Sequence, residues 1–346
     1  MLLLPSSKFH PEYTGDCGGG LPYDFITDCK ENAMHKTVVN PTLPGRESLW
    51  RRIVRNRSIY LFVLPGLAFF LLFRIYPLYF LQIAFRDFRI TRSIDRSPWM
   101  GFKYFIEVFQ TVSFGDALKN TILINLYKLA VCFPAPIILA LMFDSVQNRA
   151  LKHSAQTILY LPHFLSWVVI ASILTNLLST SNGVVNNLLN AMGHESIGFL
   201  VSKEHFRSIL VLSDLWKETG YGAIIYIAAL TSIDPELYDA ATVDGASKLQ
   251  SIWHVSIAGI KDTIVIMLIL RIGAMMGSNF DQVHSLLNPQ VYSVGDTLDT
   301  FVYRVGMSNL RFSFAAAAGL FNSAVAAVLL FSSDWLAKRL GERGLF

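Results

Sequence analysis

Charged residues are scarce in this chain. They make up 16% of its 346 residues, whereas hydrophobic residues make up 53%. A soluble domain carries about 25% charged residues, so this composition argues against an ordinary soluble protein and predicts a polytopic membrane protein. The net charge of +4 is small and is spread over the predicted loops, which argues against binding to nucleic acid.

Metal-binding and catalytic motifs are also missing. None of the three cysteines has the spacing of a metal ligand: Cys17, Cys29 and Cys132. The P-loop pattern G-x-x-x-x-G-K-[S/T] is absent, so we do not expect the chain to bind ATP through a P-loop. Without H-E-x-x-H or G-x-S-x-G, a membrane protease or esterase has no visible chemistry. Four scattered histidines receive no role: His153, His163, His254 and His284.

Residues 1–50 differ in composition from the rest of the chain. They contain three consecutive glycines at 18–20 and scattered prolines, and only three leucines separate Met1 from Pro5. That apolar stretch is too short for the core of a signal peptide, so we predict a poorly ordered cytoplasmic tail, with Met34 as an alternative start. Four arginines then form a basic collar before the first apolar segment: Arg51, Arg52, Arg55 and Arg57.

Six apolar segments follow within residues 51–346. A hydrocarbon core about 30 Å thick needs roughly 20 helical residues, and backbone groups in lipid must be satisfied within the segment, which favours helices. The sequence therefore predicts an all-α transmembrane domain with six spans and both termini on the same side. The spans are expected at about 59–85, 117–143, 156–178, 209–230, 263–282 and 313–337.

The distribution of Lys and Arg between the loops gives only a weak indication of the orientation in the membrane. With both termini in the cytoplasm, the inner segments hold slightly more Lys and Arg than the outer ones, as membrane proteins prefer. The first outer loop runs against this trend, because it reads R-D-F-R-I-T-R-S-I-D-R over 86–96.

The loop at 231–262, between spans four and five, carries strong signals for a short helix. Asp234 suits the N-cap, Pro235 the first helical position, and Glu236 complements the positive end of the helix dipole. Gly245 offers a residue that takes positive φ easily, as a helix end requires. On these features alone, an ordinary surface helix in a cytoplasmic loop remains an alternative.

The spacing of this loop resembles a family motif. The pattern D-A-A-x-x-D-G-A-x(9)-S-I-A-G-I-K is similar to the E-A-A-x-x-D-G-A loop of binding-protein-dependent ABC importer permeases. In that family the loop forms a coupling helix that docks into a groove of the ATPase subunit. Two departures are that Asp239 replaces the usual Glu, and that Ala258 and Asp262 stand where the family has prolines. The resemblance assigns ATPase coupling to Asp239, Ala240, Ala241, Asp244, Gly245 and Ala246.

Other segments extend the resemblance over residues 55–346. They are L-P-G-L-A-F-F at 64–70, Y-P-L at 76–78, W-M-G-F-K-Y-F at 99–105 and N-G-V-V-N-N-L-L at 182–189. They look most like permeases for oligosaccharides derived from polysaccharides, alginate importers among them. The resemblance implies a type I (MetI-like) permease fold in the inner membrane. It also implies these partners: a second, homologous permease subunit, two ABC ATPase subunits that bind ATP and Mg, and an extracytoplasmic solute-binding protein.

Polar residues inside the predicted spans are the candidates for the substrate pathway, because such residues usually face a bundle interior or a wet cavity. Lys128 and Arg271 in mid-span suit an anionic oligosaccharide. The alternatives are interhelical hydrogen bonds for Lys128, and an ion pair with the partner permease for Arg271. An interfacial aromatic belt would explain Trp167 equally well. The full candidate set is Asn125, Lys128, Trp167, Asn176, Lys217, Glu218, Arg271 and Asn279.

These features together predict a non-catalytic translocation subunit that itself binds no cofactor and no metal. Its substrate is expected to be an oligosaccharide, carried across the membrane when partner ATPases hydrolyse ATP. A secondary transporter driven by an ion gradient is the first alternative, although the inverted repeats common in that class are not visible. An intramembrane enzyme is the second.

Overall fold

The computed structural model describes residues 57–346, apart from 147, 278, 342, 343 and 346. The tail predicted at 1–50, and all of the basic collar except Arg57, lie outside the described residues. The chain divides into two units, Met1–Leu71 and Leu72–Phe346, which are described separately. In the first unit the main described element is helix α3 (Arg57–Phe70).

Every named element among the described residues is helical, which confirms the all-α class. After α3 the elements are η2 (Leu71–Ile75), η3 (Tyr76–Phe85), η4 (Ile94–Arg96), α4 (Lys103–Gln110), α5 (Val112–Cys132), α6 (Pro134–Ser145), α7 (Arg149–Tyr160), η5 (Leu161–Phe164), α8 (Trp167–Leu177), α9 (Val184–Ala191), α10 (Phe206–Leu230), α11 (Pro235–Val243), α12 (Lys248–Ser251), η6 (Ile252–Ile257), α13 (Lys261–Ala274), α14 (Phe280–Leu286), η7 (Pro289–Val291), α15 (Tyr292–Gly295), α16 (Leu298–Tyr303), η8 (Arg304–Ser308) and α17 (Phe312–Arg339).

Three helical stretches among the described residues are long and apolar enough to cross a membrane: Tyr60–Phe85, Val112–Ser145 and Phe312–Arg339. They match predicted spans one, two and six. Helix α10 has 25 residues and matches span four, but three of its charged side chains, Asp214, Lys217 and Glu218, lie close together in its middle. Buried partners for these side chains make such a charged span possible.

The predicted third span is bent. Helices α7 and α8 together have the apolar length of a span, but they meet at an angle of 98°. Pro162 lies in the short η5 turn between them, and the hydroxyl of Ser166 caps the new helix by accepting from the Val169 N–H. A proline removes a backbone donor and a cap starts a fresh helix, so the chain turns where hydropathy alone predicts a straight span.

The predicted fifth span is displaced along the sequence. We expected 263–282, but α13 ends at Ala274 and continues α12 and η6, so the helical stretch begins near Lys248. The connection after span four is therefore shorter than the predicted 231–262. Ala258, in place of a family proline, has helical φ and ψ of −62° and −42°, and Ile260 forms the one turn before α13.

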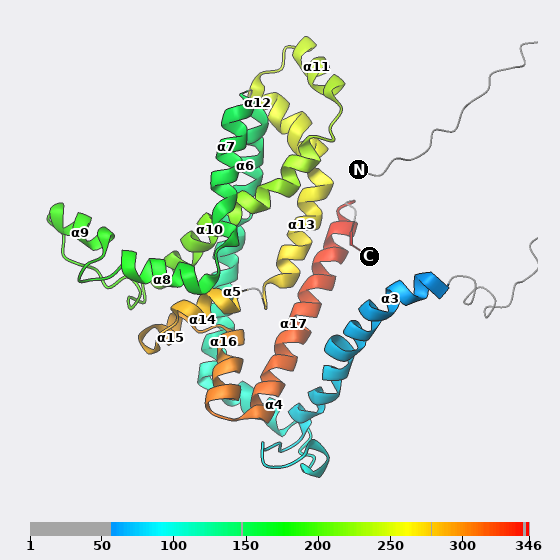
Figure 1. Ribbon diagram of the computed structural model, residues 1–346, viewed down its shortest axis with the longest axis vertical. Coiled ribbons are helices and arrows are strands. Elements are labelled where there is room, and N and C mark those ends of the chain that lie inside the picture. Colours follow the sequence, from blue (N-terminus) through cyan, green and yellow to red (C-terminus); the bar gives the residue numbers. More distant parts are fainter. Residues whose placement is uncertain (1–56, 147, 278, 342–343, 346) are drawn as a thin grey trace, which may run out of the picture. The chain divides into compact units, whose positions relative to one another are not determined.

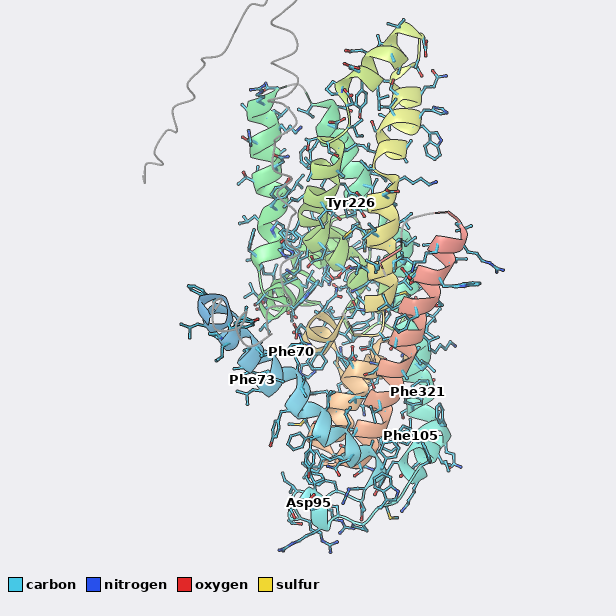
Figure 2. All side chains as sticks on the ribbon, turned by 90° about the vertical axis from the view of Figure 1, so that its right-hand side faces the viewer. Phe70, Phe73, Asp95, Phe105, Tyr226 and Phe321 are labelled. Carbon is cyan, nitrogen blue, oxygen red and sulfur yellow. The ribbon has the colours of Figure 1, made fainter. Side chains whose placement is uncertain are left out.

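Three apolar clusters hold the second unit together. One joins α4, α5, α16 and α17 around Phe114, Phe301 and Phe314. Another joins α5, α8, α10 and α14, and a third joins α6, α10 and α13 around Tyr226. Figure 2 places Phe105 and Phe321 of the first cluster near one end of this unit and Tyr226 nearer the other. In Figure 1, helix α11 occupies the end of the unit opposite to α4.

Candidate functional site

Helix α11 forms where the sequence predicts a docking helix. The side chain of Asp234 accepts from the Glu236 N–H at 3.0 Å and so caps its N-terminus. The helix ends at Val243, and Gly245 follows with φ +75°. The Ala246 N–H donates to the Ala241 carbonyl at 2.9 Å, and the Gly245 N–H donates to the Thr242 carbonyl at 3.1 Å. These two bonds make a Schellman motif, which confirms the predicted helix end.

The family motif lies on the surface of this helix. No residue of α11 is buried. Apolar side chains are exposed beside the motif, with Val243 87% and Trp253 67% exposed, and Leu237 and Leu249 also exposed. The motif residues divide into an exposed set, Asp239, Ala240, Asp244 and Gly245, and a half-buried pair, Ala241 and Ala246. A small-residue helix with open apolar neighbours can accept a partner surface.

Two contacts hold α11 against the start of span five. The hydroxyls of Tyr238 and Ser256 lie 3.0 Å apart, and Ser256 is buried. A Cβ added at Gly259 would come within 2.7 Å of Ile233 Cδ1, so this glycine allows close packing of the connection on the helix. These contacts join α11 to the helical stretch that leads into span five.

A buried polar cluster occupies the middle of the second unit. The side chain of Lys128 on α5 is 1% exposed. Its ammonium donates to Asp214 Oδ1 at 3.2 Å, to Asn279 Oδ1 at 2.6 Å and to Gln282 Oε1 at 2.5 Å. These three contacts match its three donors. Asn279 in turn donates to Asn125 Oδ1 at 2.7 Å. The cluster joins α5, α10 and α14.

Arg271 approaches the same carboxylate from the other side. Its Nη2 donates to Asp214 Oδ2 at 3.1 Å, so Asp214 accepts from two cations. Asp214 is buried, whereas the side chain of Arg271 is 33% exposed. The guanidinium also lines a cavity of about 210 Å³ between α6, α10 and α13, together with Glu218, Tyr221 and Tyr226 among others. Arg271 therefore lies at the wall of this cavity and keeps guanidinium donors that Asp214 does not use.

A second group of polar side chains surrounds the bend between α7 and α8. Lys217 is buried and donates to the His163 carbonyl at 2.5 Å, and its ammonium lies 3.5 Å from Glu218 Oε1. The other oxygen of Glu218 lies 2.9 Å from His163 Nδ1, and the imidazole stacks on Tyr221 at 3.7 Å. Trp167 lies against Lys217, with 5.5 Å from Nζ to the ring centroid.

The structure brings together most of the predicted pathway residues and separates one. Trp167, Lys217 and Glu218 line a cavity of about 500 Å³ with Asp281 and His284. Since Glu218 also lines the Arg271 cavity, the two cavities share a wall. Asn176 stands apart, because its side chain is exposed on α8 and donates only to the Ser172 carbonyl of its own helix, at 2.9 Å.

The sequence analysis missed Asp214, Gln282 and His163 in the two polar groups, and Asp281 and His284 in the cavity wall. Asp214 lies one turn before Lys217 on the same helix, and that spacing could have singled it out. Gln282 is the last residue of the predicted fifth span, 263–282, and its place at the span end gave no reason to single it out. His163 was recognised but received no role. Among the described residues no group of three or more His, Cys, Asp or Glu is placed to hold a metal ion.

Known proteins resemble this chain over most of its length. The family described as binding-protein-dependent transport system inner membrane component matches residues 133–343. The polygalacturonan/rhamnogalacturonan transport system permease protein YteP of Bacillus subtilis (strain 168) is 40% identical over 301 residues, which are 87% of this chain and 94% of that protein. Protein LplB of the same strain is 38% identical over 292 residues, covering 84% of this chain and 92% of LplB.

Solved structures share the fold. A chain of a bacterial alginate ABC transporter, crystallised with a periplasmic protein that holds an alginate pentasaccharide, matches with a TM-score of 0.80 and 37% identity. The match covers 86% of this chain and all of that one (100%). The family model spans well over half of the sequence and includes the α11 motif, and two relatives exceed 30% identity over most of the chain. This chain therefore belongs to the family of binding-protein-dependent transport system inner membrane components, the permeases of ABC importers.

Proposed function

We propose that this permease carries acidic oligosaccharides across the cytoplasmic membrane as one subunit of an ATP-driven importer. The observation that supports an acidic substrate is the position of Arg271, a half-buried cation at the wall of a cavity in the bundle. An anion that enters a low-dielectric cavity needs fixed positive charge nearby. A second matched structure belongs to a transporter that imports the acidic polysaccharide alginate, with 38% identity. No match favours the ion-driven secondary transporter.

The coupling to ATP is assigned to α11. Its exposed motif and open apolar neighbours support docking to an ATPase subunit on the cytoplasmic side, which would place both termini in the cytoplasm. The complete importer would then contain a second permease, two ATPases and an extracytoplasmic binding protein. ATP-driven closure of the ATPases would shift the bundle between inward-open and outward-open states.

The candidate pathway residues divide into two roles. Arg271, Glu218 and Trp167 line the two cavities and are proposed to meet the cargo. Lys128 uses all three of its donors within the chain, so we assign it, with Asn125 and Asn279, to holding α5 against α14. The two groups touch at Asp214, which fixes the position of Arg271.

Arg271→Met is expected to lower uptake of an acidic oligosaccharide. Hydrogen bonds to charged groups contribute about 1.5–3 kcal/mol, so we expect uptake at low substrate concentration to fall about tenfold or more. Arg271→Lys keeps the charge and is expected to retain part of the activity. The measurement is uptake into proteoliposomes that hold the assembled transporter, with a neutral oligosaccharide as control. Equal uptake of the acidic sugar by wild type and Met variant would contradict the role.

The isolated chain is expected to bind no nucleotide and to hydrolyse no ATP, because it has no P-loop. The assembled complex is expected to hydrolyse ATP. Calorimetric titration of the purified chain with ATP and Mg tests the first statement, and phosphate release by the complex tests the second. Micromolar ATP binding to the chain alone would contradict the assignment of ATP chemistry to partner subunits.

A further inference from the structure

The basic loop between η3 and α4, residues 86–102, is rigidly built. At its base, Arg86 Nη1 donates to the carbonyls of Ile94 at 3.1 Å, Asp95 at 3.4 Å and Ser97 at 3.2 Å. Arg86 and Trp99 form an antiparallel bridge. The two N–H groups of Arg86 Nη1 are thus shared among three loop carbonyls, which ties 94–97 to the start of the loop.

The loop is also fastened to the bundle. Ser313 of α17 accepts from the Phe88 N–H at 2.9 Å and donates to the Arg86 carbonyl at 2.6 Å. Tyr104 of α4 donates to Asp87 Oδ1 at 2.7 Å. Burial, together with Asp87, raises the pKa of Tyr104 to about 12, so this hydroxyl remains a donor at physiological pH. A preorganised loop loses little conformational freedom when it binds.

This loop carries four arginines and two aspartates. Its two carboxylates are held by tyrosines: Asp87 by Tyr104, and Asp95 by Tyr79 at 2.9 Å. Three arginines remain on the surface: Arg89, Arg92 and Arg96. Only Arg89 has an ion-pair partner among the described residues, Asp87 at 3.8 Å. At the tip of the loop, Ile90 is 72% exposed. The exposed side chains of the loop therefore include three arginines, Asp95 and the apolar Ile90, with a net positive charge.

The loop lies at the end of the second unit opposite to α11. Figure 2 places Asp95 further toward this end than Phe105 of α4. On α5, the exposed positions change from Asp116 and Lys119 to Ile122 and Leu126 with increasing distance from this end.

We propose that this outer arginine loop, residues 86–102, docks an acidic surface of the solute-binding protein that delivers the cargo. The presence of such a protein rests on the proposed importer function, which places the loop on the outer face. Arginine around an exposed apolar side chain is typical of protein interfaces, whereas a free acidic sugar offers no partner to Ile90. Complementary charge would steer the encounter and would account for basic residues on the side where membrane proteins avoid them.

Charge reversal tests the loop. The variant Arg89→Glu/Arg92→Glu/Arg96→Glu is placed in the complete transporter in nanodiscs, and the purified binding protein is titrated while ATPase activity is measured. We expect the half-saturating concentration of binding protein to rise about tenfold or more, and its salt dependence to weaken, because exposed charges act through steering. The matched control is Lys119→Glu/Lys203→Glu, two exposed cations outside the loop, which should change the half-saturating concentration less than about twofold.

Three results would overturn the proposal. One is an unchanged half-saturating concentration in the triple variant with normal basal ATPase activity. Another is a shift seen only with sugar-loaded and not with empty binding protein, which would assign the loop to the cargo. The third is a shift that depends on anionic lipid in the nanodisc, which would assign it to the membrane. If the wild-type complex itself shows no stimulation by a binding protein, the proposed function fails instead, independently of this loop.

Discussion

Asp214→Asn is expected to remove most of the protein from the membrane. The change keeps the shape of the side chain but leaves Lys128, 1% exposed, without an opposite charge within the bundle. Removing one partner of a buried ion pair costs about 3–5 kcal/mol, because the remaining charge stays buried and uncompensated. Arg271 is half-buried and can turn toward water, so Lys128 accounts for most of the loss. The measurements are protein level by immunoblot of membranes and the melting temperature in detergent.

The double variant Lys128→Met/Asp214→Asn provides the control. It removes both charges of the buried pair, so neither member is left buried without its counter-charge. We therefore expect protein level and melting temperature to recover at least partly relative to Asp214→Asn alone. If the single variant accumulates and melts like wild type, the buried pair does not stabilise the bundle. If the double variant is worse than the single one, the hydrogen bonds to Asn279 and Gln282 matter more than the charge.

The cluster of Lys128, Asp214 and Arg271 could be predicted from the sequence only in part. Lys128 and Arg271 were identifiable because cations in apolar spans are rare. Their shared partner was not, since the contacts of Asp214 join residues 86 and 57 positions apart in the sequence. We had expected the carboxylate, if structural, on the partner permease. It lies in this chain, and only the packing of α5, α10 and α13 shows this.

Helix ends were predicted well where local chemistry decides them. Asp234, Pro235 and Gly245 fixed both ends of α11, because capping and positive φ depend on neighbouring residues alone. Span boundaries were predicted less well, because hydropathy measures only apolar content. The helical stretch that leads into span five already includes Leu249 and Trp253, which precede the predicted boundary at 263 and are exposed. Beyond Ala274 the chain leaves α13 although Met275 and Met276 extend the apolar run, and a new helix begins at Phe280.

Gly245→Val is expected to uncouple ATP hydrolysis from transport while the protein still inserts into the membrane. Gly245 has φ +75°, and a Cβ there would meet no atom within 4 Å, so the penalty comes from the backbone and not from a clash. A left-handed conformation costs an L-residue roughly 1–2 kcal/mol, and a β-branched residue is a clear outlier there. The Schellman closure would loosen, and the exposed face of α11 would lose its shape. We expect ATP-driven uptake to fall about tenfold or more, measured together with co-purification of the ATPase.

A matched control exists on α9. Gly193 has φ +83° and open space around its Cβ position. The bonds Gly193 N–H to Asn190 carbonyl, 3.0 Å, and His194 N–H to Leu189 carbonyl, 2.9 Å, repeat the closure found after α11. Gly193→Val therefore carries the same backbone strain in a helix that lacks the family motif, and it should leave ATPase co-purification intact. Gly245→Asn, which tolerates this conformation better, should restore much of the uptake. Normal uptake in Gly245→Val, or equal loss of the ATPase in both valine variants, would mean that α11 is not the coupling helix.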